Sequence, residues 1–90
     1  MVYLITYDLN KKGQNYEKLY ESIKSLGSCA HYLDSTWFVD TYRTSNDIRD
    51  ILRNVMDSND SLFVSKVTKS YSGWLPNEAW DWLSKHVTDF

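Results

Sequence analysis

The chain has 90 residues and a formal net charge of −2, from 10 basic and 12 acidic side chains. This length allows one domain and leaves no room for a second core, and the charge lacks the basic excess typical of proteins that bind nucleic acids non-specifically. The single cysteine, Cys29, excludes an internal disulfide and favours a reducing compartment. Since no stretch is long and apolar enough to span a bilayer, the sequence predicts a cytoplasmic protein that makes no membrane contact.

So small a domain buries little of its surface and commonly needs a disulfide, a metal or a partner chain. The two histidines, His31 and His86, are far apart in the sequence and have no cysteine partners, so no metal-binding cluster stands out. We therefore expect the chain to gain the missing stability by forming a homodimer.

Residues 2–9 predict a strand that is apolar on both faces, with Tyr3 and Ile5 on one side and Val2 and Leu4 on the other. A strand of this kind is central in a sheet and covered on both sides. Helices can cover one of these faces, and a second subunit is a natural cover for the other.

The apolar period then becomes that of an amphipathic helix, with an N-cap at Asn15 and a glycine stop at Gly27. Residues 29–33 and 36–42 follow as two short strands, and the two residues between them, 34–35, are a hairpin candidate.

A second helix begins at Thr44, and Asp47 completes a capping box with it. The last core strand covers residues 62–68. Pro76 suits the first position of a final helix, where its missing N–H costs nothing. The inner stripe of this helix consists of Ala79, Trp80, Leu83 and Val87.

The order β-α-β-β-α-β is that of the ferredoxin-like fold, an antiparallel sheet with two helices on one face. We therefore predict a single α+β domain over residues 1–90, with a C-terminal helical extension at 76–88. The uncovered sheet face favours a homodimer, and the tryptophan-rich final helix is the alternative cover. The expected interface residues are Tyr3, Ile5, Trp37, Trp74, Trp80 and Trp82.

Short motifs in a fixed order resemble the small CRISPR-associated Cas-two family and its VapD-type and SinR-like relatives. Tyr7-Asp8-Leu9 closes the first strand, a helix that ends in glycine follows, and residues 31–39 read HYLDSTWFV. The SinR-like group matches best, through Asp34-Ser35-Thr36-Trp37, Asn59-Asp60-Ser61-Leu62, Gly73-Trp74-Leu75 and Ala79-Trp80-Asp81-Trp82-Leu83. The resemblance covers most of the chain.

The resemblance implies a homodimer whose sheets face each other. It also implies an acidic residue near the two-fold axis, proposed in some members to bind Mg²⁺ for phosphodiester cleavage, and that position is Asp8 here. The chain departs from the CRISPR members at Ala30 and His31, where they usually carry an arginine and a glutamine. It also has no obvious counterpart to their basic surfaces, which argues against a role in spacer integration.

Asp8 is the sharpest catalytic candidate, because one carboxylate from each subunit could hold a hydrated divalent cation. The alternative is a structural aspartate that hydrogen-bonds the following turn. Tyr7 and Asn10 flank Asp8 and could contact a ligand, although Tyr7 fits a core or interface position better. His31 could act as a general base opposite Asp8, or simply be a surface histidine on a strand.

Two pairs of lysines could bind a phosphate. Lys11 and Lys12 follow Asp8 in the same connection, while Lys66 and Lys69 precede Trp74 and could combine charge with base stacking. The alternative for Lys11 and Lys12 is that they are solvated charges in a loop. The alternative for Trp74, Trp80 and Trp82 is burial against the sheet or a partner chain.

Three functions remain open. The preferred one is a homodimeric Cas-two-like module that binds a nucleotide or nucleic acid without catalysis, such as a phage or defence-associated protein that sequesters a nucleotide signal. The second is a Mg²⁺-dependent nuclease or phosphodiesterase that uses Asp8. The third is a protein-interaction or regulatory module that docks through its C-terminal tryptophans.

Overall fold

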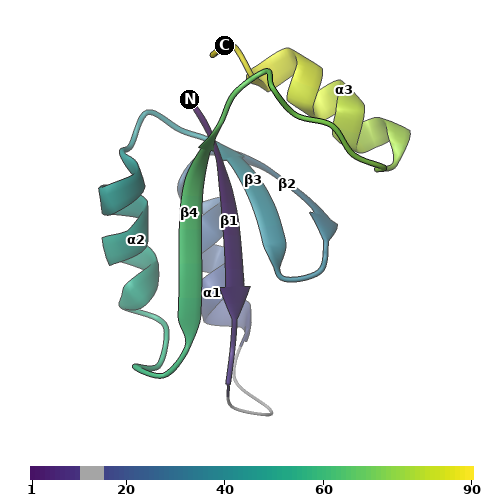
Figure 1. Ribbon diagram of the computed structural model, residues 1–90. Coiled ribbons are helices and arrows are strands. Elements are labelled where there is room, and N and C mark those ends of the chain that lie inside the picture. The colour runs from purple at the N-terminus through teal and green to yellow at the C-terminus, as the bar shows by residue number, and fades with distance from the viewer. Residues whose placement is uncertain (11–15) are drawn as a thin grey trace.

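The computed structural model describes residues 1–10 and 16–90. Within these ranges the elements follow the order β-α-β-β-α-β-α, which confirms the predicted α+β class (Figure 1). Their bounds are β1 (Val2–Asp8), α1 (Tyr16–Lys24), β2 (Ser28–Leu33), β3 (Thr36–Asp40), α2 (Ser45–Arg53), β4 (Ser61–Val67) and α3 (Asn77–His86).

The four strands form one sheet in the order β2-β3-β1-β4, in which every neighbouring pair is antiparallel. β1 and β3 are central, and β2 and β4 are the edges. Leu4 in β1 lies opposite Phe38 of β3 and Ser65 of β4, so these three side chains share one face. This order is the ferredoxin-like arrangement that the sequence predicts.

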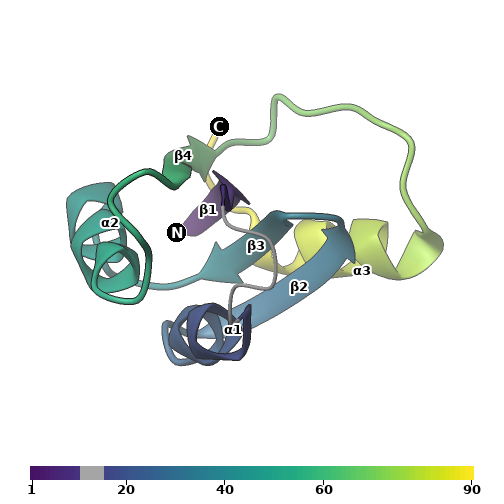
Figure 2. The ribbon, with the colours of Figure 1, turned by 90° about the horizontal axis from the view of Figure 1, so that it is seen from below.

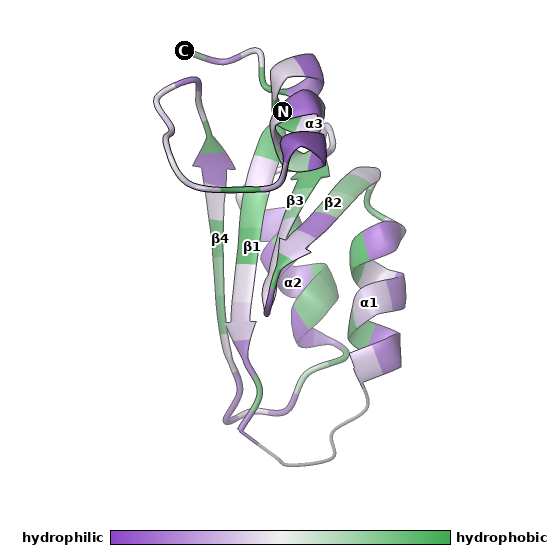
Figure 3. Ribbon diagram, turned by 90° about the vertical axis from the view of Figure 1, so that its right-hand side faces the viewer, coloured by the Kyte–Doolittle hydropathy of each residue, from purple (hydrophilic) through white to green (hydrophobic). Residues whose placement is uncertain are grey.

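α1 and α2 lie side by side on one face of this sheet (Figure 3). Tyr3, Ile5 and Tyr7 of β1 point to this face and are nearly inaccessible to solvent. Burial of each such side chain contributes roughly 1.5–3 kcal/mol, so this core is the main source of stability. The other buried members of the cluster are Leu19, Ile23, Leu26, Trp37, Val39, Ile48 and Leu52.

The predicted interface role of Tyr3, Ile5 and Trp37 is wrong. All three belong to the helix-covered core, where they are at most 4% exposed, so they present no surface to a second chain. The alternation of the sequence shows which residues share a face, and α1 and α2 cover the face that these three residues occupy.

α3 covers one end of the opposite face, as the alternative sequence interpretation allows (Figure 1). Val2 and Phe38 pack there against Leu83 of α3 and Val87 just after it, in a second buried cluster. Further along β1, Leu4 is only partly buried. The open part of this face lies beneath the segment that joins β4 to α3, on the side away from α1 and α2 (Figure 2).

Local signals account for several element ends. Thr44 caps α2: its hydroxyl accepts from the Asp47 N–H at 3.1 Å and the Asp47 carboxylate accepts from the Thr44 N–H, which confirms the capping box. At Gly27, a Cβ atom would overlap the backbone carbonyl oxygen of Asp40, so only glycine allows this approach to β3. The predicted N-cap at Asn15 lies outside the described residues.

The final helix begins one residue later than the sequence predicts. Pro76 occupies the N-cap position of α3, not its first helical position, and its carbonyl oxygen accepts from the Ala79 N–H at 3.0 Å. Over residues 1–10 and 16–90, none of the helices combines the length and the apolar character needed to cross a membrane.

Candidate functional site

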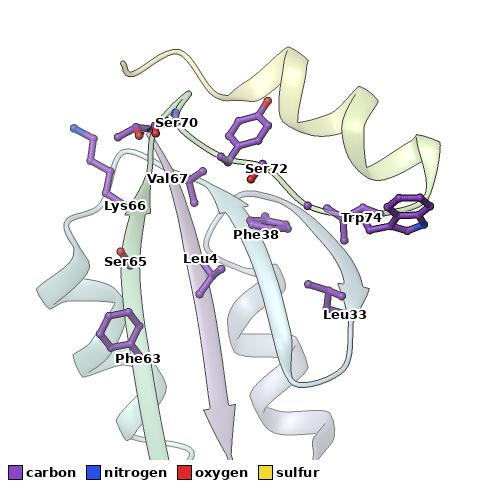
Figure 4. A pocket seen from close by; sticks show the side chains of 14 residues that line it. Leu4, Leu33, Phe38, Phe63, Ser65, Lys66, Val67, Ser70, Ser72 and Trp74 are labelled. Carbon is purple, nitrogen blue, oxygen red and sulfur yellow. Dashed lines mark hydrogen bonds between the residues drawn. The ribbon is translucent and has the colours of Figure 1, made fainter.

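A groove with a volume of about 620 Å³ lies between the open sheet face and residues 68–75 (Figure 4). Its floor comes from three neighbouring strands, through Leu4 of β1, Phe38 of β3 and Phe63 of β4. The register brings these side chains together, because Leu4 pairs with Phe38 and with Ser65, two residues from Phe63. The remaining lining residues are Leu33, Ser65, Lys66, Val67, Thr68, Ser70, Tyr71, Ser72, Gly73, Trp74 and Leu75.

Packing against α3 fixes the wall of the groove. The Tyr71 ring stacks on Trp80 with ring centroids 6.0 Å apart and planes 19° apart. Leu75 is partly buried in the cluster beneath α3. Between these two anchors, Trp74 is 98% exposed. An indole left in solvent at the rim of an apolar groove is typical of a binding surface.

The lining combines aromatic rings, hydroxyl groups and one charged residue. Among the described residues that line the groove, only Lys66 carries a charge, and its Nζ atom lies 3.6 Å from Oδ2 of Asp89. Nearby, the Lys69 ammonium lies 4.3 Å from the centroid of the Phe90 ring, and this lysine is not part of the lining. Because Lys66 pairs with Tyr3 of β1, its side chain leaves β4 on the face of α1 and α2, and its ammonium points away from the groove (Figure 4). The groove surface can therefore stack a planar ring and donate hydrogen bonds from serines.

Asp8 lies outside the groove. It is the last residue of β1, exposed and opposite Ser61 of β4, and it lines a second hollow of about 220 Å³ with Thr6 and with Phe63, which also lines the groove. Over residues 1–10 and 16–90, the chain has no group of three or more His, Cys, Asp or Glu side chains close enough to hold a metal ion. A cation at Asp8 would therefore need ligands from elsewhere, such as water or a partner chain.

The predicted pairing of His31 with Asp8 does not form, because the two side chains lie on opposite faces of the sheet. His31 stacks on Trp37 of the helix-covered core, with ring centroids 3.9 Å apart, and meets Tyr20 of α1 edge-on at 5.5 Å. Burial lowers the pKa of His31 below its usual 6.5, despite the opposing effect of Asp34. The surface-histidine interpretation matches this exposed position.

The other predicted contacts of Asp8 have structural partners of their own. Tyr7 is buried and its hydroxyl accepts from Nε1 of Trp37 at 3.2 Å, so its ring belongs to the core, although the residue also lines the hollow beside Asp8. Asn10 joins two loops, because its N–H donates to the Asp60 carboxylate at 3.0 Å. Lys11 and Lys12 lie outside the described residues.

Cys29 and the tryptophans of α3 have structural surroundings. Burial raises the pKa of the Cys29 thiol, which disfavours a nucleophilic role. Trp80 and Trp82 are half-buried between α3 and the rest of the chain, and Trp82 stacks near Phe38 with ring centroids 6.4 Å apart. Of the predicted tryptophan contacts, Trp74 therefore remains the one that is presented to solvent.

Sequence reasoning missed the floor of the groove. Phe63 is 62% exposed on an edge strand, and Leu4 and Phe38 are adjacent to it only through the sheet register. An available signal was Phe63 itself, since it alternates with the inward-facing Leu62 and Val64 and therefore points to the face without α1 and α2.

No family model matches the chain. Its structure is similar to the crystal structure of a hypothetical protein, TT1823, from Thermus thermophilus, with a TM-score of 0.58 and 23% sequence identity. The match covers 83% of this chain and 93% of that chain. This likeness shows the shared fold.

Proposed function

We propose that the chain is a homodimeric module that binds a nucleotide or a short nucleic acid in the groove without catalysing a reaction. The observation that carries this proposal is the groove itself, which joins an aromatic floor and rim to several hydroxyl groups. Stacking of a base on an aromatic side chain is worth about 1–3 kcal/mol, which compensates for the shortage of positive charge.

The open face also supports self-association. Leu33, Phe63 and Trp74 are large apolar side chains exposed around the groove. Contiguous apolar surface of this kind marks interaction sites in soluble proteins. In a dimer whose open faces meet, the ligand would lie between the two sheets. The ferredoxin-like fold supports the resemblance to the Cas-two-like family, and membership of that family belongs to the same proposal.

Isothermal titration with mononucleotides, dinucleotides and cyclic nucleotides tests the binding function. We expect at least one of these ligands to bind the unmodified protein, and Trp74→Ala to weaken that binding about tenfold, since one stacking contact is lost. Tyr42→Ala is the matched control, because Tyr42 is also an exposed aromatic residue and lies outside the groove. If none of the ligands binds, the nucleotide function is rejected.

A second function, docking to another protein, is favoured by the full exposure of Trp74. Aromatic side chains of this kind are common energetic centres of protein interfaces. A pull-down tests this function in a protein that binds no nucleotide. A partner that the unmodified chain and Tyr42→Ala both capture, and that Trp74→Ala does not capture, would favour docking over nucleotide binding.

A further inference from the structure

Ser65 places a hydroxyl group on the otherwise apolar floor of the groove. It pairs with Leu4 of β1, so its side chain leaves β4 on the open face, and it lies between Phe63 and Val67 along the strand (Figure 4). Among the described strand residues that line the groove, Lys66 has the only other polar side chain, and that side chain leaves β4 on the face of α1 and α2. Ser65 is therefore the polar group that the sheet itself presents to a ligand.

The hydroxyl of Ser65 is available to a ligand. Among residues 1–10 and 16–90 it has no hydrogen-bond partner, and the side chain is half-buried. By contrast, the Thr68 hydroxyl in the wall already accepts from the Ser70 N–H at 3.3 Å. A hydroxyl that is partly removed from water without a partner costs free energy, so a ligand that supplies the partner is favoured. A single polar group on an apolar floor also fixes how the ligand is oriented.

No cation among the described lining residues faces the groove. The Lys66 ammonium points away from it and lies 3.6 Å from Oδ2 of Asp89, and the Lys69 ammonium lies over the Phe90 ring (Figure 4). A phosphate in the groove would therefore lose hydration and gain no ion pair. The lining instead matches an uncharged group, and the volume of about 620 Å³ is within the roughly 300–1,000 Å³ usual for small-molecule sites.

We propose that the groove takes an uncharged planar heterocycle, which in a nucleotide is the base, and that Ser65 is the specificity-determining residue that hydrogen-bonds the edge of this ring. The inference rests on the proposed function, because the groove is taken as the ligand site. A ring that packs on Leu4 and Phe63 brings a ring nitrogen or an exocyclic amine within reach of the Ser65 hydroxyl, which can donate or accept. The phosphate of a nucleotide stays in solvent and adds no affinity.

Isothermal titration compares adenosine with AMP on the unmodified chain and on Ser65→Ala. We expect the two ligands to bind the unmodified chain with affinities within about threefold of each other, because the phosphate makes no contact. Ser65→Ala should weaken both about threefold to tenfold, through the loss of one hydrogen bond. Ser61→Ala is the matched control, since Ser61 lies on the same face of β4 but outside the groove, and it should leave both affinities unchanged.

Two kinds of result would overturn the inference and leave the groove as a nucleotide site. Affinities for AMP and adenosine that differ by more than about threefold would show that the protein senses the phosphate. An adenosine affinity that is unchanged in Ser65→Ala, or that falls equally in Ser61→Ala, would show that Ser65 does not contact the ring. Urea denaturation should give the same midpoint for Ser65→Ala as for the unmodified chain, because no hydrogen bond between described residues is lost.

Indole separates this inference from the proposed function. Indole and indole-2-carboxylate are titrated against the unmodified chain and Ser65→Ala while the amide NMR signals of Phe63 and Gly73 are followed. A response to indole that is weaker in Ser65→Ala, with no stronger response to the carboxylate, supports the inference even if neither adenosine nor AMP binds, an outcome that would reject only the nucleotide function. No response to indole, an equal response in both proteins, or a stronger response to the carboxylate would overturn the inference.

Discussion

Nδ1 of His86 lies 2.8 Å from Oδ2 of Asp40, and this contact fastens the last turn of α3 to the end of β3. The same imidazole stacks on Trp82, with ring centroids 4.1 Å apart. The pair thus secures the helix that covers one end of the open sheet face. Burial alone would raise the pKa of Asp40, but hydrogen bonds from His86 and the Met1 amine outweigh it and leave the pKa below its usual 3.8.

Asp40→Asn should therefore destabilise the fold in a pH-dependent way. Because the pKa of Asp40 is lowered by folding, its stabilising effect is complete above pH 3.8 and is lost as the pH falls through the lowered folded value. We expect a loss of roughly 0.5–1 kcal/mol in the free energy of unfolding at neutral pH, measured by urea denaturation. The difference from the unmodified chain should shrink below pH 3.8; a difference that stays constant down to the most acid pH would contradict this assignment.

Gly27→Ala should destabilise the chain far more than Gly73→Ala. A Cβ atom at residue 27 would overlap the Asp40 carbonyl oxygen, whereas one at residue 73 would lie 3.7 Å from a Trp80 ring carbon, an ordinary contact. We expect a loss of roughly 2 kcal/mol or more for the first substitution and less than about 0.5 kcal/mol for the second. The urea midpoints of the two variants measure the difference, and equal midpoints would show that β2 and β3 can separate without cost.

The sequence predicts those parts of the fold that depend on neighbouring residues. The capping box of Thr44 and Asp47 is local, and so is the alternation of β1, and both are confirmed. Whether the side chains of Asp8 and His31 share one face of the sheet could not be predicted, because that depends on the register between strands. The register of β2 with β3 is moreover irregular between Ala30 and Leu33.

The groove was also beyond sequence reasoning. Its wall depends on a tertiary contact, because Tyr71 stacks on Trp80 of α3 and thereby sets the path of residues 68–75. Its floor depends on which sheet face α1 and α2 leave open. Neither fact is contained in a periodicity, which explains why the predicted interface included Tyr3 and Ile5 from the covered face and omitted Phe63.

Tyr7→Phe should destabilise the core, although only a hydroxyl is lost. The Tyr7 oxygen accepts from Nε1 of Trp37 at 3.2 Å in a buried site, and removing it leaves a buried donor without its partner. The expected loss is about 1–3 kcal/mol in the free energy of unfolding. Tyr3→Phe is the control, because that buried hydroxyl makes a weaker contact with the Met1 sulfur at 3.9 Å, and it should change stability by less than about 0.5 kcal/mol.

An alkaline titration of the unmodified chain provides a second readout of Tyr7. Burial raises its pKa from 10.0 to about 12. The neutral form is favoured by folding, so this stabilisation is complete below pH 10.0 and is lost as the pH rises through about 12. In a titration followed by tyrosinate absorbance, one tyrosine should ionise at a higher pH than the others, and Tyr7→Phe should remove this high-pH step. If the step persists in Tyr7→Phe, it belongs to another tyrosine.

Phe63→Ser should weaken the proposed dimer without unfolding the chain. Phe63 is 62% exposed in one chain, so the substitution removes little internal packing and should change the free energy of unfolding of the monomer by less than about 0.5 kcal/mol. Sedimentation velocity should show a dimer for the unmodified protein and for Tyr42→Ser, and a shift towards monomer for Phe63→Ser. A protein that sediments as a monomer before any substitution would reject the homodimer.

Asp8→Asn separates binding from phosphodiester cleavage. Asp8 is exposed at the end of β1 and does not line the groove, so we expect the variant to bind nucleotides with unchanged affinity. We also expect no Mg²⁺- or Mn²⁺-dependent cleavage of RNA, DNA or cyclic nucleotides by the unmodified chain, since a hard cation needs several oxygen ligands in a defined geometry. Asp34→Asn, which removes an exposed carboxylate from the β2–β3 turn, is the matched control. Cleavage by the unmodified chain and by Asp34→Asn, but not by a folded Asp8→Asn, would replace the binding function with a metal-dependent phosphodiesterase.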